Sequence, residues 1–278
     1  MSKKTKNEVK ETPKIYPSLV LGLDISTACI GVSIVYDDGV NKPQIREIKH
    51  IVPKIPSNID GIEALILRKN VFEENFLNSI KDIGITECVI ESPLVHATGN
   101  SNAYTVSQLL QFNGILCEAV YRVLGIVPIC ISSHDAREQS FPELLAIRKF
   151  NRKGEIYPLT HIKKALKSED LVLFGTYPFD CDKKSVMMNM VNESYPQIEW
   201  VRNNKGEIKK ENYDACDSLV CVLAYINTKR YGNIDAHIKS FSIMEEDKNY
   251  NIEYEVSVWD KILTKKIVVP KTEKTKRK

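Results

Sequence analysis

Four acidic residues interrupt apolar segments of the chain. Asp24 lies in LVLGLDIST, Glu91 ends CVIE, and Asp214 and Asp217 lie in NYDACDSLVCVLAYI. Burying a carboxylate without a partner is costly because its hydration is lost, so acids within core elements need a compensating cation. Two divalent metal ions about 3.5–4 Å apart can supply that charge and support hydrolysis of a phosphodiester. The four acids therefore predict a two-metal phosphodiesterase site.

The ligand types indicate which metal such a site would hold. Hard cations such as Mg²⁺ prefer oxygen ligands, and four carboxylates supply oxygen without Cys or His. The five histidines are scattered and the seven cysteines include no CxxC pair, so we expect no zinc site. Most cysteines lie in apolar segments, as reduced core residues do. We expect two Mg²⁺ ions per site, with Mn²⁺ as a substitute.

The elements that must position the acids follow from apolar periodicity. Five strands are predicted. The first two, at about 18–24 and 30–36, are joined by a short turn. The third lies near 44–52, and the last two lie in ITECVIES and in GIVPICISS. Helices are predicted at about 59–82, 102–124, 182–195 and 212–229. This order is that of a ribonuclease H-like α/β fold, a mixed five-stranded sheet flanked by helices.

The last predicted helix can aim two carboxylates at one point. Asp214 and Asp217 are three residues apart and share a helical face. Apolar residues can anchor the rest of this helix in the core: Leu219, Val222, Leu223 and Ile226. Gly22 and Gly31, on the first two strands, would permit other elements to approach closely.

The rest of the chain is assigned by composition. Residues 1–17 read as a flexible basic leader and 18–230 as the main domain, with an insertion at about 139–181. Residues 231–278 form an extension with one or two added strands and a basic tail. The net charge is +3, and the lysines at both ends of the chain either contact phosphate or only aid solubility.

Bulk composition excludes some classes of protein. Hydrophobic residues make up 43% and charged residues 27%, as in an ordinary globular protein. There is no run of eighteen apolar residues and no secretory signal, so we expect a cytoplasmic protein that does not enter a membrane.

Several motifs resemble those of RuvC-type Holliday junction resolvases. GLDISTACIGVSIV is similar to the first-strand motif of that family, VIES to the segment with its second acid, and DACDSLVCVLAY to its terminal DxxD helix. NAYTVSQLLQFNGILCEAVYRVLGIVPICISSHDAR is similar to the intervening helix and strand. The matching positions there include Asn102, Gln111, Gly114, Gly125 and Arg137. The insertion and the C-terminal extension have no counterpart in the bacterial enzymes, and their presence is consistent with a phage or viral member.

The resemblance implies specific roles. Asp24 would be the ligand shared by two Mg²⁺ ions, and the other three acids would complete the shells. Lys183, with Lys184 beside it, occupies the place of a lysine that aids catalysis. Arg137, His96 and both lysines would contact DNA, with His96 or Tyr104 as a stacking residue. The implied substrate is a four-way junction in DNA, nicked on two strands by a homodimer.

Other classes of function are weighed against this one. Sugar kinases and actin-like ATPases also carry an Asp followed by Ser or Thr on the first strand, but they need glycine-rich phosphate loops, and the 12 glycines here are dispersed. A nuclease for flaps and forks, or a junction-binding protein without turnover, remains open.

Overall fold

The chain was analysed as a computed structural model that describes residues 17–93, 102–141, 182–234, 236–259 and 261–270. The predicted leader and nearly all of the predicted insertion fall outside these ranges. None of the described helices is long and apolar enough to cross a membrane. Every cysteine within the described ranges is a free thiol; most of them are buried, but Cys130 is exposed.

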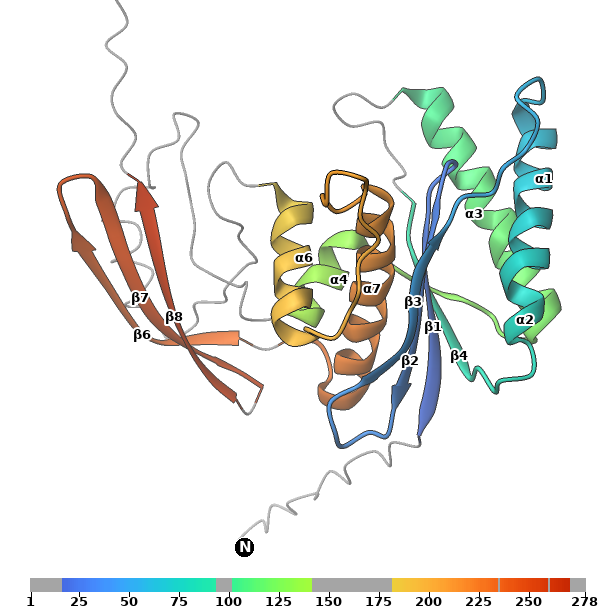
Figure 1. The fold of residues 1–278 in the computed structure, drawn as a ribbon. Helices are drawn as coiled ribbons and strands as arrows, with labels where there is room; N and C mark the ends of the chain where they lie inside the picture. The colour runs from blue at the N-terminus through green and yellow to red at the C-terminus, as the bar shows by residue number, and fades with distance from the viewer. Residues whose placement is uncertain (1–16, 94–101, 142–181, 235, 260, 271–278) are drawn as a thin grey trace, which may run out of the picture.

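A mixed five-stranded sheet forms the centre of the fold, in the order β3-β2-β1-β4-β5 (Figure 1). Strand β2 pairs antiparallel with β1 and β3, whereas β4 is parallel to β1 and β5 is parallel to β4. This confirms the predicted ribonuclease H-like α/β fold. The strand bounds are β1 Ser18–Ile25, β2 Ile30–Asp37, β3 Gln44–Ile51, β4 Glu87–Glu91 and β5 Ile129–Ile131.

Helices cover both faces of this sheet (Figure 1). On one face lie α1 (Gly61–Phe72), a short π-helical segment (Glu73–Leu77), α2 (Asn78–Ile80) and α3 (Ala103–Leu124). On the other lie α4 (Ser133–Ser140), α6 (Lys183–Ser194) and α7 (Glu211–Tyr231). Asn102 and Gly125, singled out by the sequence, are the caps of α3: Asn102 accepts a hydrogen bond from the Thr105 amide, and Gly125 has a φ of 71°.

The predicted helix at 59–82 differs in its details. A π-helical turn at Glu73–Leu77 interrupts it, and the helical region ends at Ile80. Ile62 and Ile66, which precede this turn in α1, are exposed. The inserted turn shifts the helical phase, and its adjacent residues Phe76 and Leu77 are both fully buried. A simple helical repeat cannot anticipate this change of phase.

The segment after β5 is more regular than predicted. The chain forms α4 here, a helix that was not predicted, which is capped by Ser132 and followed by the buried Phe141. Ala136 is the one apolar residue within α4, and the other positions are polar or charged, so apolar periodicity in the sequence could not reveal this helix. Residues 139 and 140 of the predicted insertion therefore belong to α4.

The C-terminal extension contains three strands, where one or two were expected. Strands β6 (Ala236–Glu245), β7 (Asn249–Val258) and β8 (Lys261–Pro270) form a separate antiparallel sheet in the order β6-β7-β8. Figure 1 shows this sheet beside the layer that contains α4, α6 and α7. The buried Val258 marks where its β7–β8 end meets the main domain.

Two glycines allow α7 to lie directly on β1 and β2. A Cβ added at Gly31 would lie 1.9 Å from the Asp214 carbonyl oxygen, and one added at Gly22 would lie 2.5 Å from the Ser218 carbonyl oxygen. Both distances are far below van der Waals contact, so these positions confirm the predicted close approach. The backbone that carries Asp214 and Asp217 is thereby pressed against the sheet.

The Gly31→Ala variant tests this contact. The added methyl group would collide with backbone atoms of α7, and overpacking of this kind typically costs about 1–3 kcal/mol. We expect the free energy of unfolding, measured by urea denaturation, to fall by at least this amount. The control is Gly114→Ala in α3, where an added Cβ meets nothing within 4 Å and should stabilise the helix by about 0.5–1 kcal/mol. Unchanged stability in Gly31→Ala would contradict the close approach.

Candidate metal centre

Strand register brings the first two acids together. Leu23 pairs with Ile90 across the parallel β1 and β4, so the next residues, Asp24 and Glu91, lie side by side at the carboxyl ends of the two strands. Successive side chains on a strand point to opposite faces. Leu23 and Ile90 pack on the α1 and α3 side, so both carboxylates face α7.

Helix α7 completes the cluster. Carboxylate oxygens of Asp24, Glu91 and Asp217 all lie within 4.8 Å of one another. Asp214 lies one turn earlier on α7, with its side chain 18% exposed against 7% for Asp217. Three of the four predicted acids thus converge closely, and Asp214 lies at the more open edge of the group.

This crowding has a clear electrostatic signature. Burial, followed by repulsion from Glu91, Asp217 and Asp214, raises the pKa of Asp24 well above its usual value. Burial and the neighbouring Asp217 raise the pKa of Glu91 to about 7. Burial also raises the pKa of Asp217, although nearby cations oppose this effect. Without a bound cation, the carboxylates cannot all be ionised at neutral pH without strain on the fold.

Lys184 is the lysine that the structure places at the acids. Its Nζ lies 3.6 Å from an Asp214 oxygen and 3.5 Å from an Asp217 oxygen. Burial alone would lower the pKa of Lys184, but the charges of Asp217, Asp214 and Asp24 raise it instead. The side chain of Lys183, which was predicted for this role, lies outside the part of the chain that the structure describes.

The start of α6 explains why Lys184 points at α7. Asp182 caps the helix, and its carboxylate accepts hydrogen bonds from the backbone amides of Lys184 and Ser185. The Ser185 hydroxyl also lies 3.3 Å from the Tyr213 hydroxyl of α7. These contacts set the phase of α6 relative to α7, which neighbouring lysines in a sequence do not disclose.

Arg137, on α4, is a second cation near the acids. Its charge lowers the pKa of both Glu91 and Asp217, which opposes the larger effect of burial on each. It was predicted as a DNA contact, and its half-buried position beside the carboxylates gives it an electrostatic role at the site. His96, the other predicted contact outside α6, lies outside the described residues.

Two supporting residues were not predicted. Asn113 of α3 donates a hydrogen bond of 3.4 Å to the backbone carbonyl of Glu91, which holds the end of β4. Cys29 lies in the turn between β1 and β2, and burial together with the charge of the nearby Asp214 raises the pKa of its thiol to about 12. Neither residue type is distinctive enough in the sequence to reveal these contacts.

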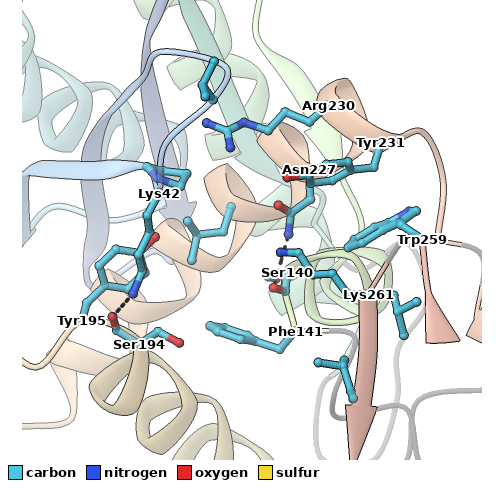
Figure 2. A pocket seen from close by; sticks show the side chains of 15 residues that line it. Lys42, Ser140, Phe141, Ser194, Tyr195, Asn227, Arg230, Tyr231, Trp259 and Lys261 are labelled. Carbon is cyan, nitrogen blue, oxygen red and sulfur yellow. Dashed lines mark hydrogen bonds between the residues drawn. The ribbon is translucent and has the colours of Figure 1, made fainter. Parts of the chain in front are cut away.

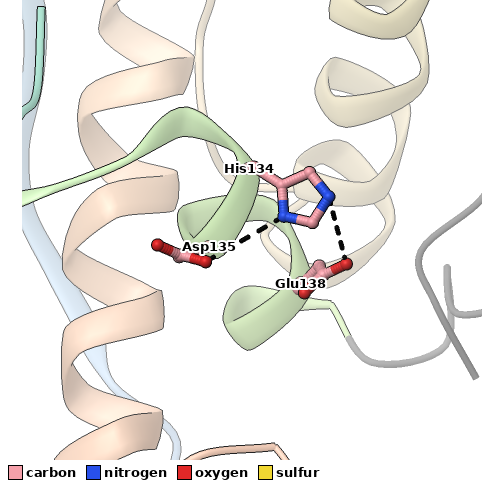
Figure 3. Close-up of side chains that lie close together, drawn as sticks. All are labelled: His134, Asp135 and Glu138. Atoms are coloured by element: carbon pink, nitrogen blue, oxygen red, sulfur yellow. Dashed lines mark ion pairs between the residues drawn. The ribbon is translucent and has the colours of Figure 1, made fainter. Parts of the chain in front are cut away.

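A second group of possible ligands lies on α4 (Figure 3). The His134 Nε2 is 3.4 Å from Glu138 and its Nδ1 is 3.9 Å from Asp135. However, the side chains of His134 and Asp135 are 72% and 63% exposed, and Asp135 also accepts a hydrogen bond from Ser132. Water solvates such a group adequately, so it creates no need for a cation.

The carboxylate cluster, in contrast, fits a divalent metal ion. Its four acids carry more negative charge than Lys184 and Arg137 neutralise. Burial, with repulsion between the acids as a smaller cause, raises the pKa values of Asp24, Glu91 and Asp217. Its donor atoms are all carboxylate oxygens, which suit a hard cation. Asp24, Glu91 and Asp217 are placed to bind it, with Asp214 beside them.

Comparisons with known proteins concern the fold. No family model matches the chain, and no curated protein matches its sequence. RuvC from Thermus thermophilus matches with a TM-score of 0.46 at 15% identity, over 77% of this chain and 97% of RuvC. The T. thermophilus RuvC complex with a Holliday junction substrate matches with a TM-score of 0.47 at 15% identity, over 78% of this chain and 97% of that chain. The yeast mitochondrial Holliday junction resolvase Ydc2 matches with a TM-score of 0.43 at 13% identity, over 78% of this chain and 81% of that chain.

The pH dependence of stability tests the electrostatics of the cluster. The Glu91 carboxyl titrates near 4.5 when unfolded and at about 7 when folded, so the folded state binds more protons between these values. Stability of the metal-free protein should therefore fall as pH rises from about 4.5 to 7, by roughly 3 kcal/mol from this group. The measurement is urea denaturation with a chelator across pH 5–8.

Two matched variants distinguish the titration of Glu91 from the effect of removing any acidic side chain. Glu91→Gln should flatten the fall in stability, whereas Glu118→Gln, which removes an acid that is 59% exposed, should keep it. Added Mg²⁺ at pH 7.5 should stabilise the wild type and Glu118→Gln more than Glu91→Gln. A wild-type profile that is already flat without metal would contradict the strained cluster.

Proposed function

We propose that this protein is a metal-dependent DNA endonuclease that resolves four-way junctions by hydrolysing phosphodiester bonds. The observation that carries the proposal is the convergence of three largely buried carboxylates, from β1, β4 and α7, with their oxygens within 4.8 Å. Such a concentration of negative charge is unfavourable for folding and is useful only where it binds cations.

The residues take distinct roles in this proposal. Asp24 would hold the divalent ions together with Glu91, Asp214 and Asp217. Bound there, Mg²⁺ would lower the pKa of a water molecule and neutralise charge on the scissile phosphate. Lys184 orients Asp214 and Asp217 by direct ion pairing and presents a cation to the approaching phosphate. Arg137 adds positive charge on the α4 side.

The choice of DNA junctions as substrate rests on the likeness of three motifs to RuvC-type resolvases. GLDISTACIGVSIV, VIES and DACDSLVCVLAY carry all four acids. Resolution needs two coordinated nicks and hence two sites, so a homodimer is part of the proposal. Two other functions are compatible with the same site: cleavage of flaps and forks in DNA, and binding of junctions without cleavage.

Asp24→Asn tests the assignment of the site. It removes a metal ligand together with one negative charge near the DNA, so cleavage of a labelled immobile four-way junction in Mg²⁺ should fall below detection while binding is retained or strengthened. The control is Asp135→Asn, which removes an exposed acid of α4 and should cleave at the wild-type rate. Cleavage at the wild-type rate by Asp24→Asn would refute the site.

The same assay decides between substrates when a fork, a flap and a linear duplex are run beside the junction. Paired symmetric nicks in the junction alone support a resolvase, and cutting of every branched substrate supports a broader nuclease. Tight junction binding without cleavage in Mg²⁺ or Mn²⁺ supports the binding-only alternative. Ca²⁺ should support binding with little cleavage, because it tolerates looser coordination.

Lys184→Met tests the lysine. Loss of the cation at Asp214 and Asp217 should lower the rate of junction cleavage by about 10²-fold at saturating protein, as expected for a group that stabilises charge in the transition state. Lys183→Met, the neighbouring substitution, should have a much smaller effect on this rate. The reverse order of the two variants would return the catalytic role to Lys183.

A further inference from the structure

A cavity of about 440 Å³ lies where the C-terminal sheet meets the main domain (Figure 2). Its lining comes from the link between β2 and β3, the ends of α4 and α6, the last turns of α7 and the β7–β8 turn. This volume lies within the range of small-molecule sites, about 300–1,000 Å³. None of the residues assigned above to the metal centre is among its described lining residues.

The cavity is separate from the carboxylates. Four residues of α7 line it, namely Leu223, Asn227, Arg230 and Tyr231, and all lie on the C-terminal side of Asp217. At 1.5 Å per residue, Leu223 lies about 9 Å along the helix axis from Asp217, and Arg230 lies about 20 Å from it. The two places are therefore connected by one helix, and Arg230 and Tyr231 lie at the end of the cavity farther from the carboxylates.

Positive charge dominates the cavity. Lys42 and Lys261 are exposed side chains on opposite sides of it (Figure 2). Arg230 also lines it, but its guanidinium is paired with the buried Asp37 and is nearly fully buried. No carboxylate occurs among the described residues that line the cavity. The two lysines therefore favour an anionic ligand.

Aromatic rings lie beside these lysines. Tyr231 and Trp259 have ring centroids 5.0 Å apart, and the Lys261 Nζ is 5.8 Å from the centroid of Tyr231. On the other side, the Lys42 Nζ is 4.2 Å from the centroid of the Tyr195 ring. A ligand with a planar ring and an anionic group would match both features, because bases stack on aromatic side chains and phosphates pair with lysine.

Trp259 is placed at the cavity by the β7–β8 hairpin. Val258 pairs with Lys261, so Trp259 is the first residue of a two-residue turn, and its φ of 49° is the positive value that such turns use. The turn sets the indole beside Tyr231 at the edge of the cavity.

We propose that this cavity binds a nucleotide unit, with its phosphate between Lys42 and Lys261 and its base against Tyr231 and Trp259. The nucleotide is either free or an unpaired residue of single-stranded DNA. The second source rests on the proposed function, since a branched substrate held at the carboxylates has strands that can reach the other end of α7.

Fluorescence gives a direct test because the chain has two tryptophans, Trp200 and Trp259. In a Trp200→Phe protein with chelator present, thymidine monophosphate, a thymidine octanucleotide and inorganic phosphate are titrated in turn. Quenching of Trp259 by the nucleotide or the oligonucleotide, and not by phosphate alone, is expected. Tighter binding of the oligonucleotide identifies DNA as the source, and equal or tighter binding of the monophosphate identifies a free nucleotide.

Variants then test which side chains contact the ligand. Their affinity for a labelled thymidine octanucleotide is measured by fluorescence anisotropy. Lys42→Ser with Lys261→Ser should weaken binding at least tenfold and reduce the slope of log affinity against log salt by about 1.4. Trp259→Ala should weaken it about fivefold or more, and Trp259→Phe, which keeps a ring, by less. The control pair, Lys54→Ser with Lys205→Ser, removes two other exposed lysines and should change binding little.

The outcomes are distinct from those of the cleavage assay. No quenching by either nucleotide probe, equal quenching by phosphate, or equal losses in the two lysine pairs would overturn the nucleotide site, whatever the cleavage result. Because a chelator is present, failure of junction cleavage leaves the binding measurement valid. Junction cleavage by a protein that fails these titrations would leave the proposed function standing without the cavity.

Discussion

Close contact between α7 and the sheet is the constraint on which the rest of the structure depends. At Gly22 and Gly31 the strands β1 and β2 have no side chain of their own, and the helix backbone lies so close there that an added Cβ would collide with it, so Asp214 and Asp217 are carried to the strand ends. The helix is buried almost continuously from Ala215 to Ala224, between the sheet and α4 and α6. Its apolar packing stabilises an arrangement that repulsion among the carboxylates would otherwise oppose.

The same contact creates the electrostatic problem that defines the site. Three carboxylates share a small, largely buried volume, and the nearby cations Lys184 and Arg137 compensate them only in part. Hydrophobic cores on both faces of the sheet offset the unfavourable free energy of this repulsion. They contain large buried side chains such as Phe72, Phe76 and Phe112. Such a division of roles, in which apolar layers hold an unfavourable polar centre, is typical of enzymes that bind metal ions.

Helix α7 also connects the two functional proposals. Its first turns carry the acids, and its last turns carry Tyr231 and Arg230 at the cavity beside the C-terminal sheet. Asp37 and Arg230 form a buried ion pair that fastens this end of the helix to the end of β2. A rigid element fixed at both ends can hold two sites at a constant separation, which suits an extended polymer such as DNA better than a small substrate.

The sequence by itself determined the identity of the acids, their order along the chain and the elements that carry them. Strand and helix periods are local properties and locate these elements. The order of the elements, which is that of a ribonuclease H-like fold, then predicted that Asp24, Glu91, Asp214 and Asp217 converge, and the structure brings three of them within 4.8 Å, with Asp214 beside them. Only the tertiary structure decided that Lys184 faces the acids, that α4 brings Arg137 near them, and that the β7–β8 end of the C-terminal sheet lines a cavity with α7. These features depend on the phase between helices and on contacts between distant segments, neither of which leaves a periodic pattern in the chain.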